Sequence, residues 1–170
     1  FLAITFLIPF TGMSQIYRDA EASAIVKGAS LLKISEERKS VDYFKPGNSQ
    51  QISEATHMNW LRDELLQLTQ AEELRLEKTE RDLHGYTHYR YQQFYNGIRV
   101  EHGVYYVHIK NGYVTSANGE WYINIMTQTS PTLSTDAAFA KALAAVPSEK
   151  YNDHVDNGLE GAKEKGELVI

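Results

Sequence analysis

The residues best suited to do chemistry here are the histidines within HGYTHYRYQQFYNGIRVEHG, residues 84–103. His84 and His88 stand four residues apart, the spacing at which two histidines on a helix hold zinc in many metalloproteases. That motif also needs a glutamate directly after the first histidine to activate water, but Gly85 follows His84. In a strand the two imidazoles would lie about 13 Å apart, too far for one zinc ion. The spacing therefore does not predict a zinc site.

A second arrangement of histidines involves His102 and His108, on one predicted strand. A two-residue turn at Asn96-Gly97 would place His102 opposite Tyr91, Gln92 opposite Glu101, and Arg90 diagonal to that glutamate. Tyrosine–imidazole packing and an Arg–Glu–Gln cluster would explain these residues without any ligand. A bulge at Gly103 would shift the register.

Other catalytic arrangements find no support in the residues. The sequence has no cysteine, no Gly-x-Ser-x-Gly elbow and no glycine-rich phosphate loop, and its carboxylates follow surface patterns. A net charge of -5 without a basic stripe argues against nucleic-acid binding. The sequence thus predicts no catalytic activity for this chain, with an enzyme using an unrecognised His/Tyr site as the weakest alternative.

Both ends of the sequence carry apolar runs. Residues 1–10 are almost entirely apolar, and Gly12 and Ser14 supply the small residues of a signal-peptidase site. We expect residues 1–14 to be an N-terminally truncated signal peptide, which directs export and leaves no stable membrane anchor after its removal. The final residues, KGELVI, end within a predicted strand.

Before the histidine-rich stretch, one segment has weak secondary-structure signals and the next has a clear helical pattern. Residues 15–47 read as a connecting segment, with a short helix or strand around residues 24–32 followed by an irregular polar connection. From Asn48 or Ser49 as N-cap, an amphipathic helix is predicted, because apolar residues recur with helical spacing at Met58, Leu61, Leu65 and Leu68. His57 and Trp60 are expected to pack against a sheet.

From Glu72 onward the pattern has a period of two. Leu74 and Leu76 alternate with charges, as in a half-buried strand. Two Asn-Gly pairs, at Asn96-Gly97 and Asn111-Gly112, lie between β-branched and aromatic runs and predict two hairpins with type I′ turns. The expected result is an antiparallel β-meander packed against the amphipathic helix.

A second small unit follows at residues 132–170. Ser134 is a predicted N-cap, Asp136 favours the first turn, and Phe139, Ala142, Leu143 and Val146 form one helical face that ends at Pro147. A polar linker at residues 152–165 leads to a predicted strand at residues 167–170. The fold class is therefore α+β: a meander on a helix, then a helix-plus-strand unit.

The segment DLHGYTHYRYQQFYNGIRVEHGVYYVHIKNGYVTSANGEWY resembles the FTP domain, the fungalysin/thermolysin propeptide module, over about forty residues. The matching helix and strand of the second unit resemble the start of a PepSY-like unit, incomplete at its C-terminus. The resemblance divides the chain into a signal peptide (1–14), a connecting pro-segment (15–47), an FTP domain (48–127) and a PepSY-like unit (132–170). The family pattern is matched at Asp82, Gly85, Thr87, His88, Arg90, Gln92, Gln93, Tyr95, Asn96, Gly97, Val100, Gly103, Val114, Thr115, Ser116, Asn118 and Gly119.

The resemblance implies the pro-region of a secreted bacterial zinc metalloendopeptidase precursor. Such a region acts as intramolecular chaperone and inhibitor of its cognate catalytic domain, and the matched residues are expected to define the fold or an interface rather than to catalyse. Neither metal nor cofactor is expected in this chain; zinc and calcium would belong to the downstream protease domain. Arg99, Glu101 and His102 depart from the family pattern and would put a charged patch on the hairpin. The alternative is a free-standing exported FTP/PepSY binding module.

Overall fold

The computed structural model describes residues 14–145 and 168–170. It separates into two compact units, Phe1–Ile125 and Met126–Ile170. The expected signal peptide, apart from Ser14, and the linker at residues 152–165 lie outside the described residues. No helix within the described part of the chain is long and apolar enough to cross a membrane.

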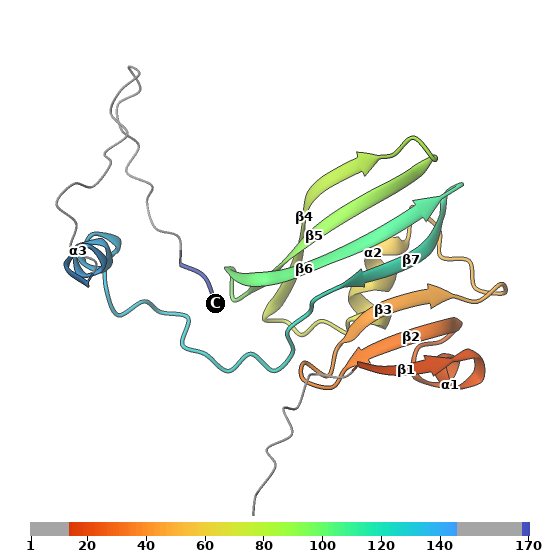
Figure 1. Cartoon of the computed structure of the whole chain (residues 1–170), viewed down its shortest axis with the longest axis horizontal. Coiled ribbons are helices and arrows are strands. Elements are labelled where there is room, and N and C mark those ends of the chain that lie inside the picture. The colour runs from red at the N-terminus through yellow and green to blue at the C-terminus, as the bar shows by residue number, and fades with distance from the viewer. Residues whose placement is uncertain (1–13, 146–167) are drawn as a thin grey trace, which may run out of the picture. The chain divides into compact units, whose positions relative to one another are not determined.

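The first unit is built on one seven-stranded antiparallel sheet, so the chain is α+β, as predicted (Figure 1). The strand order is β1-β2-β3-β7-β6-β5-β4, and the last four strands in the chain form the predicted meander. The strands span Ser14–Arg18 (β1), Ala29–Ser35 (β2), Val41–Pro46 (β3), Glu72–Arg81 (β4), Tyr86–Tyr95 (β5), Ile98–Lys110 (β6) and Tyr113–Gly119 (β7).

Both predicted hairpin turns are present. Asn96 and Gly97 have φ of 48° and 78°, and Asn111 and Gly112 have φ of 53° and 78°. Asparagine and glycine tolerate these left-handed angles, which a two-residue type I′ turn requires at both central positions. The two turns set the order β5-β6-β7 from local sequence alone.

The register predicted for the first hairpin is wrong beyond its turn. Phe94 does pair with Arg99, but Gln92 then pairs with Val104 rather than with Glu101. The extra residues form a bulge on β6, in which His102 has a φ of 63°. As a result, neither the His102–Tyr91 contact nor the Gln92–Glu101 contact is formed.

The predicted helix is much shorter than expected. It comprises α2 (His57–Trp60) and the π-helical turn η1 (Leu61–Leu65), so the N-cap predicted at Asn48 or Ser49 is wrong. The preceding residues pair with β7 instead: the Val114 amide donates to Ile52, and the Glu54 amide donates to Gly112. Backbone groups engaged in this pairing cannot also form helical hydrogen bonds.

The apolar stripe of this helix faces the core nonetheless. Leu61 and Leu65 are buried, and Met58 and Leu68 pack against the core at its margin. His57 and Trp60 pack against the sheet as predicted, since both are buried and the Trp60 ring lies 4.8 Å from that of Phe44.

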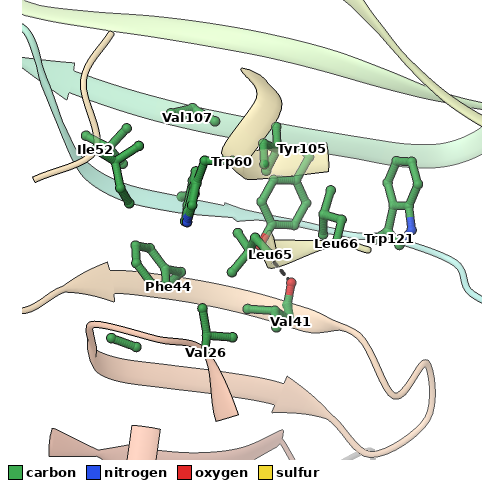
Figure 2. Packing of buried hydrophobic residues seen from close by; sticks show 14 of the residues in the cluster. Val26, Val41, Phe44, Ile52, Trp60, Leu65, Leu66, Tyr105, Val107 and Trp121 are labelled. Atoms are coloured by element: carbon green, nitrogen blue, oxygen red, sulfur yellow. Dashed lines mark hydrogen bonds between the residues drawn. The ribbon is translucent and has the colours of Figure 1, made fainter. Parts of the chain in front are cut away.

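Residues 15–47 are more ordered than the sequence suggests. The helix α1 (Asp19–Ile25) is followed by β2 and β3, so the expected irregular connection after residue 32 is wrong. Val41 and Phe44 of β3 are buried in the same core as α2 and η1 (Figure 2). The buried Tyr105 hydroxyl donates to the Val41 carbonyl oxygen at 2.8 Å and links β6 to β3.

Strand β4 lies at the edge of the sheet. Leu74 is buried, but Leu76 is 53% exposed, so the predicted alternation holds for only one of its two leucines. The register also shifts between Leu76 and Lys78. Charged side chains and a bulge are common on edge strands, where they discourage pairing with another chain.

The second unit contains α3 (Thr135–Ala145). Ser134 caps it as predicted, because its Oγ accepts a hydrogen bond from the Ala137 amide at 3.2 Å.

Candidate functional site

The matched family residues cluster on the meander, and the first of them, Asp82, organises the β4–β5 turn. Its Oδ1 accepts hydrogen bonds from the backbone amides of His84 at 2.9 Å and Tyr86 at 2.8 Å. The hydrogen bond from the Tyr86 amide is the largest cause of the lowered pKa of Asp82. Gly85 has a φ of 81°, which glycine adopts without steric cost. Both residues therefore set the start of β5.

From this turn a chain of polar side chains crosses three strands. The Oδ2 atom of Asp82 lies 3.4 Å from His88 Nε2, and His88 Nδ1 lies 2.7 Å from His108 Nδ1. His108 Nε2 in turn lies 2.7 Å from Asn118 Oδ1. Asp82 thus contacts His88 directly, and His88 is linked to Asn118 through His108, which was not among the predicted site residues.

Tyrosines flank this histidine pair on both strands. The Tyr86 ring is stacked with His88 at an interplanar angle of 7°, and the Tyr106 ring with His108 at 2°. The Lys110 ammonium lies 4.4 Å from the centre of the Tyr86 ring, within cation–π distance. These side chains lie on the face of the sheet opposite α2, which we call the outer face.

Arg90 continues the outer face toward the first hairpin. It forms an ion pair with Glu77, and its Nε donates to the Tyr106 hydroxyl at 3.1 Å. Arg99 lies 3.8 Å from the same glutamate. The predicted Arg–Glu–Gln cluster is therefore not formed. The acidic partner of Arg90 is Glu77 of β4 rather than Glu101, and the Gln92 side chain bonds backbone carbonyl oxygens instead.

Gln92 and Gln93 are fully buried and hold the β6 bulge in place. Gln92 Nε2 donates to the carbonyl oxygens of Val100 at 2.7 Å and Gly103 at 3.0 Å. Gln93 donates to the Tyr122 carbonyl and accepts from its amide, as a neighbouring strand would. A Cβ atom on Gly103 would lie 2.8 Å from the Gln93 side chain, so the bulge requires glycine.

Gly119 permits another close approach at the end of β7. A Cβ atom there would lie 2.2 Å from the Val104 carbonyl oxygen and 2.7 Å from Tyr105 Cα. These are backbone atoms that cannot move aside, so β6 and β7 pack at this point only with glycine.

His84, whose spacing from His88 resembles that of a zinc motif, does not belong to the His88–His108 pair. His84 is exposed in the β4–β5 turn, not in a strand as the distance argument assumed. No group of three or more His, Cys, Asp or Glu side chains among residues 14–145 and 168–170 is arranged to hold a metal ion. The expectation that this chain carries no metal or cofactor stays a prediction.

A second histidine cluster lies on the opposite, inner face of the meander. His57 Nδ1 contacts the Glu54 carbonyl oxygen at 2.5 Å, and its Nε2 lies 2.6 Å from the Tyr91 hydroxyl. Tyr89 donates to the Glu54 carboxylate at 2.6 Å. Because the carbonyl oxygen only accepts, Nδ1 carries the proton of the neutral ring and Nε2 accepts from the Tyr91 hydroxyl. Burial raises the pKa of Tyr91 to about 12.

Comparison with protein-family models matches residues 72–120 to the Fungalysin/Thermolysin Propeptide Motif. The match runs from the first residue of β4 to the residue after β7. This segment is a fungalysin/thermolysin propeptide motif. A comparison with curated proteins gives no match.

A propeptide motif of this kind implies the propeptide of a thermolysin- or fungalysin-type metalloprotease, a non-catalytic part of the precursor of a secreted enzyme. It also implies association with the cognate protease domain.

Each predicted site residue of the motif has a contact or a backbone angle that explains its type. Sequence reasoning missed His108, Glu77 and Tyr106 as members of the outer-face cluster. The pairing of His108 with His88 requires a register shift of three residues, because Gln92 lies opposite Val104 instead of Glu101. An ordinary one-residue bulge at Gly103 would not have predicted it.

Proposed function

We propose that this chain is the pro-region of a secreted bacterial zinc metalloendopeptidase, which it helps to fold and keeps inactive. The observation that carries the proposal is the match of the propeptide motif to the whole β4–β7 meander. The histidine, arginine and glutamine side chains of the motif are occupied in holding that meander together, which fits a binding role better than a catalytic one.

The physical basis of such a role is preferential binding to the native protease. A partner that binds the folded protease domain but not the unfolded one stabilises the fold by mass action. Covalent attachment within one precursor makes the encounter intramolecular, so modest contacts give high occupancy until the link is cleaved. In this proposal zinc and calcium belong to the protease domain, and no nucleic acid or membrane anchor takes part.

We assign the protease contact to the outer face of the meander. This face carries two tyrosines, Tyr86 and Tyr106, together with Arg90 and Lys110, and α2 and η1 cover only the inner face. Tyrosine and arginine are enriched at the centres of protein interfaces. The charges at Arg99, Glu101 and His102 would then tune which protease surface fits at the hairpin end.

The domain division is part of the same proposal. Residues 1–14 would direct export, residues 48–127 would form the FTP domain, and residues 132–170 would begin a PepSY-like unit. In the structure the connecting segment, residues 15–47, shares its sheet and core with the motif. We therefore expect it to be needed for the folding of the pro-region.

The test is to add the 170-residue chain to a denatured metalloendopeptidase domain taken from the same reading frame. We expect a higher yield of refolded activity and inhibition of the mature enzyme. Lys110→Glu should weaken the inhibition, whereas Lys27→Glu makes the same charge change at an exposed position outside the meander and should not. If the chain changes neither yield nor activity, the pro-region proposal is wrong. A reading frame without a protease domain would favour the free-standing module instead.

A further inference from the structure

The contact between two ring nitrogens on the outer face determines where the protons of this histidine pair lie. His88 Nδ1 and His108 Nδ1 are 2.7 Å apart, and both rings are half-buried. Two bare nitrogen lone pairs repel at this separation, as do two N–H groups. Such a contact is favourable only when one proton lies between the two atoms.

The partners of the two outer ring nitrogens determine which ring donates the hydrogen bond between the histidines. A carboxylate only accepts, so His88 Nε2 must donate to Asp82, and a neutral His88 then presents Nδ1 as an acceptor. His108 Nδ1 is therefore the donor. Its Nε2 faces the amide of Asn118, which can accept through Oδ1 or, after a 180° rotation, donate through Nδ2.

This arrangement limits how many protons the pair can take. A first added proton gives His108 two N–H groups, and Asn118 Oδ1 accepts the new one. A second added proton sets N–H against N–H between the rings, whose centres are 4.9 Å apart, and places two positive charges on one patch. The hydrogen bond between β5 and β6 side chains is then lost.

The other charged and titratable groups around the pair do not cancel this effect. Asp82 offsets one positive charge, and Glu80, which stands opposite His88, is already paired with Lys78 at 2.7 Å. Burial, as the largest cause, lowers the pKa of His108, and the neighbouring His88 lowers it further. The remaining neighbours are Arg90 and Tyr86 on β5, Tyr106 and Lys110 on β6, and Ser116 and Asn118 on β7.

We infer that the His88–His108 pair is an acid-sensitive clasp that holds the meander closed at neutral pH and opens on acidification. The unfolded chain takes up a proton on each histidine near the ordinary pKa of about 6.5, whereas the folded pair resists this uptake. Below about pH 6.5 the unfolded state thus binds more protons, and stability falls as pH falls. Acidification would also loosen the hold on a protease, a consequence that rests on the proposed function.

The test measures urea unfolding of the 170-residue chain between pH 7.5 and pH 5. Each pKa unit of resistance in the folded state changes the folding constant about tenfold, so the wild-type urea midpoint should drop across this range. The double variant H88Q/H108Q should lose most of that drop. The double variant H84Q/H102Q also removes two histidines, but both are exposed and outside the pair, and it should keep the wild-type profile.

A second measurement needs no variant: NMR titration of the imidazoles in the wild-type chain. We expect His108 to titrate below the ordinary range, in part because of the neighbouring His88. Equal pH profiles for the two double variants, or independent titration of the two rings, would overturn the clasp. So would a neutral-pH stability that falls with a chelator and returns with Zn²⁺, because a metal rather than a proton would then join the rings. Failure of the protease assays alone would sink the proposed function and leave the clasp intact.

Discussion

The two faces of the meander hold two histidine clusters that differ in their partners. On the inner face, His57 lies between a carbonyl oxygen and the Tyr91 hydroxyl. On the outer face, His88 and His108 are partners to each other. A hydroxyl can switch from donor to acceptor, so the inner cluster can keep its contacts in either protonation state, whereas two facing imidazoles cannot.

The comparison shows that the type and burial of a histidine do not by themselves decide its role. The inner cluster joins the segment before α2 to β5 and belongs to the core. The outer cluster joins β5, β6 and β7 on the face that we assign to the protease contact. A structural bond is therefore expected on one side and a pH-dependent one on the other.

The largest expected effect comes from removing the inner histidine. His57→Ala would leave the buried Tyr91 hydroxyl unpartnered and open a cavity beneath β5. We expect a loss of about 3 kcal/mol in the free energy of unfolding, measured with urea at pH 7.5. A loss under about 0.5 kcal/mol, the size expected of a surface position, would contradict the core role of this cluster.

Tyr91→Phe isolates the hydrogen bond of the inner cluster. It keeps the ring and removes only the hydroxyl that donates to His57 Nε2. The expected destabilisation is about 1–2 kcal/mol, because a buried acceptor loses its partner. Tyr89→Phe is the matched control: its hydroxyl bonds a carboxylate that can reach water, so the effect should be smaller.

A double-mutant cycle of His88→Ala and His108→Ala measures the outer bond. At pH 7.5 the coupling energy should be favourable by about 1 kcal/mol, the usual size of a net hydrogen bond. At pH 5 it should vanish or become unfavourable, because the folded pair keeps its shared proton only by resisting a proton that the unfolded chain takes up. Coupling that is the same at both pH values would make the outer pair an ordinary structural contact like the inner one.

The smallest effect is expected for His84→Gln. The His84 side chain is exposed, and only its backbone amide bonds Asp82. The free energy of unfolding should change by no more than about 0.5 kcal/mol at any pH from 5 to 7.5. A larger change would mean that the β4–β5 turn depends on this imidazole.

The sequence predicted those parts of the molecule that local chemistry decides. Asn-Gly pairs specify hairpin turns by their own backbone preferences, and the strands of the meander follow from those turns. The helix start failed because residues 52–54 pair with β7, a contact between segments far apart in the chain. Strand β3 was missed for a similar reason, since its burial depends on α2 and β7.

The candidate site was predicted as a set of residues but not as an arrangement. The family pattern singled out His88 and Asn118, yet their link through His108 depends on the β6 bulge. That bulge requires the fit of Gly103 against Gln93, which no local propensity encodes. A shift of this kind changes every cross-strand contact beyond it, so the contacts at Arg90 were also predicted with the wrong acidic partner.

The most direct test of the contrast between the two faces is a nitrogen–nitrogen NMR coupling across the outer hydrogen bond. In the uniformly ¹⁵N-labelled chain, a proton shared between His88 Nδ1 and His108 Nδ1 should give a measurable coupling at pH 7.5 that disappears at pH 5. His57 should give none at either pH, because both of its partners are oxygen atoms. If His88 and His108 show no coupling at pH 7.5 in the folded chain, they do not share a proton, and the account of the outer face is wrong.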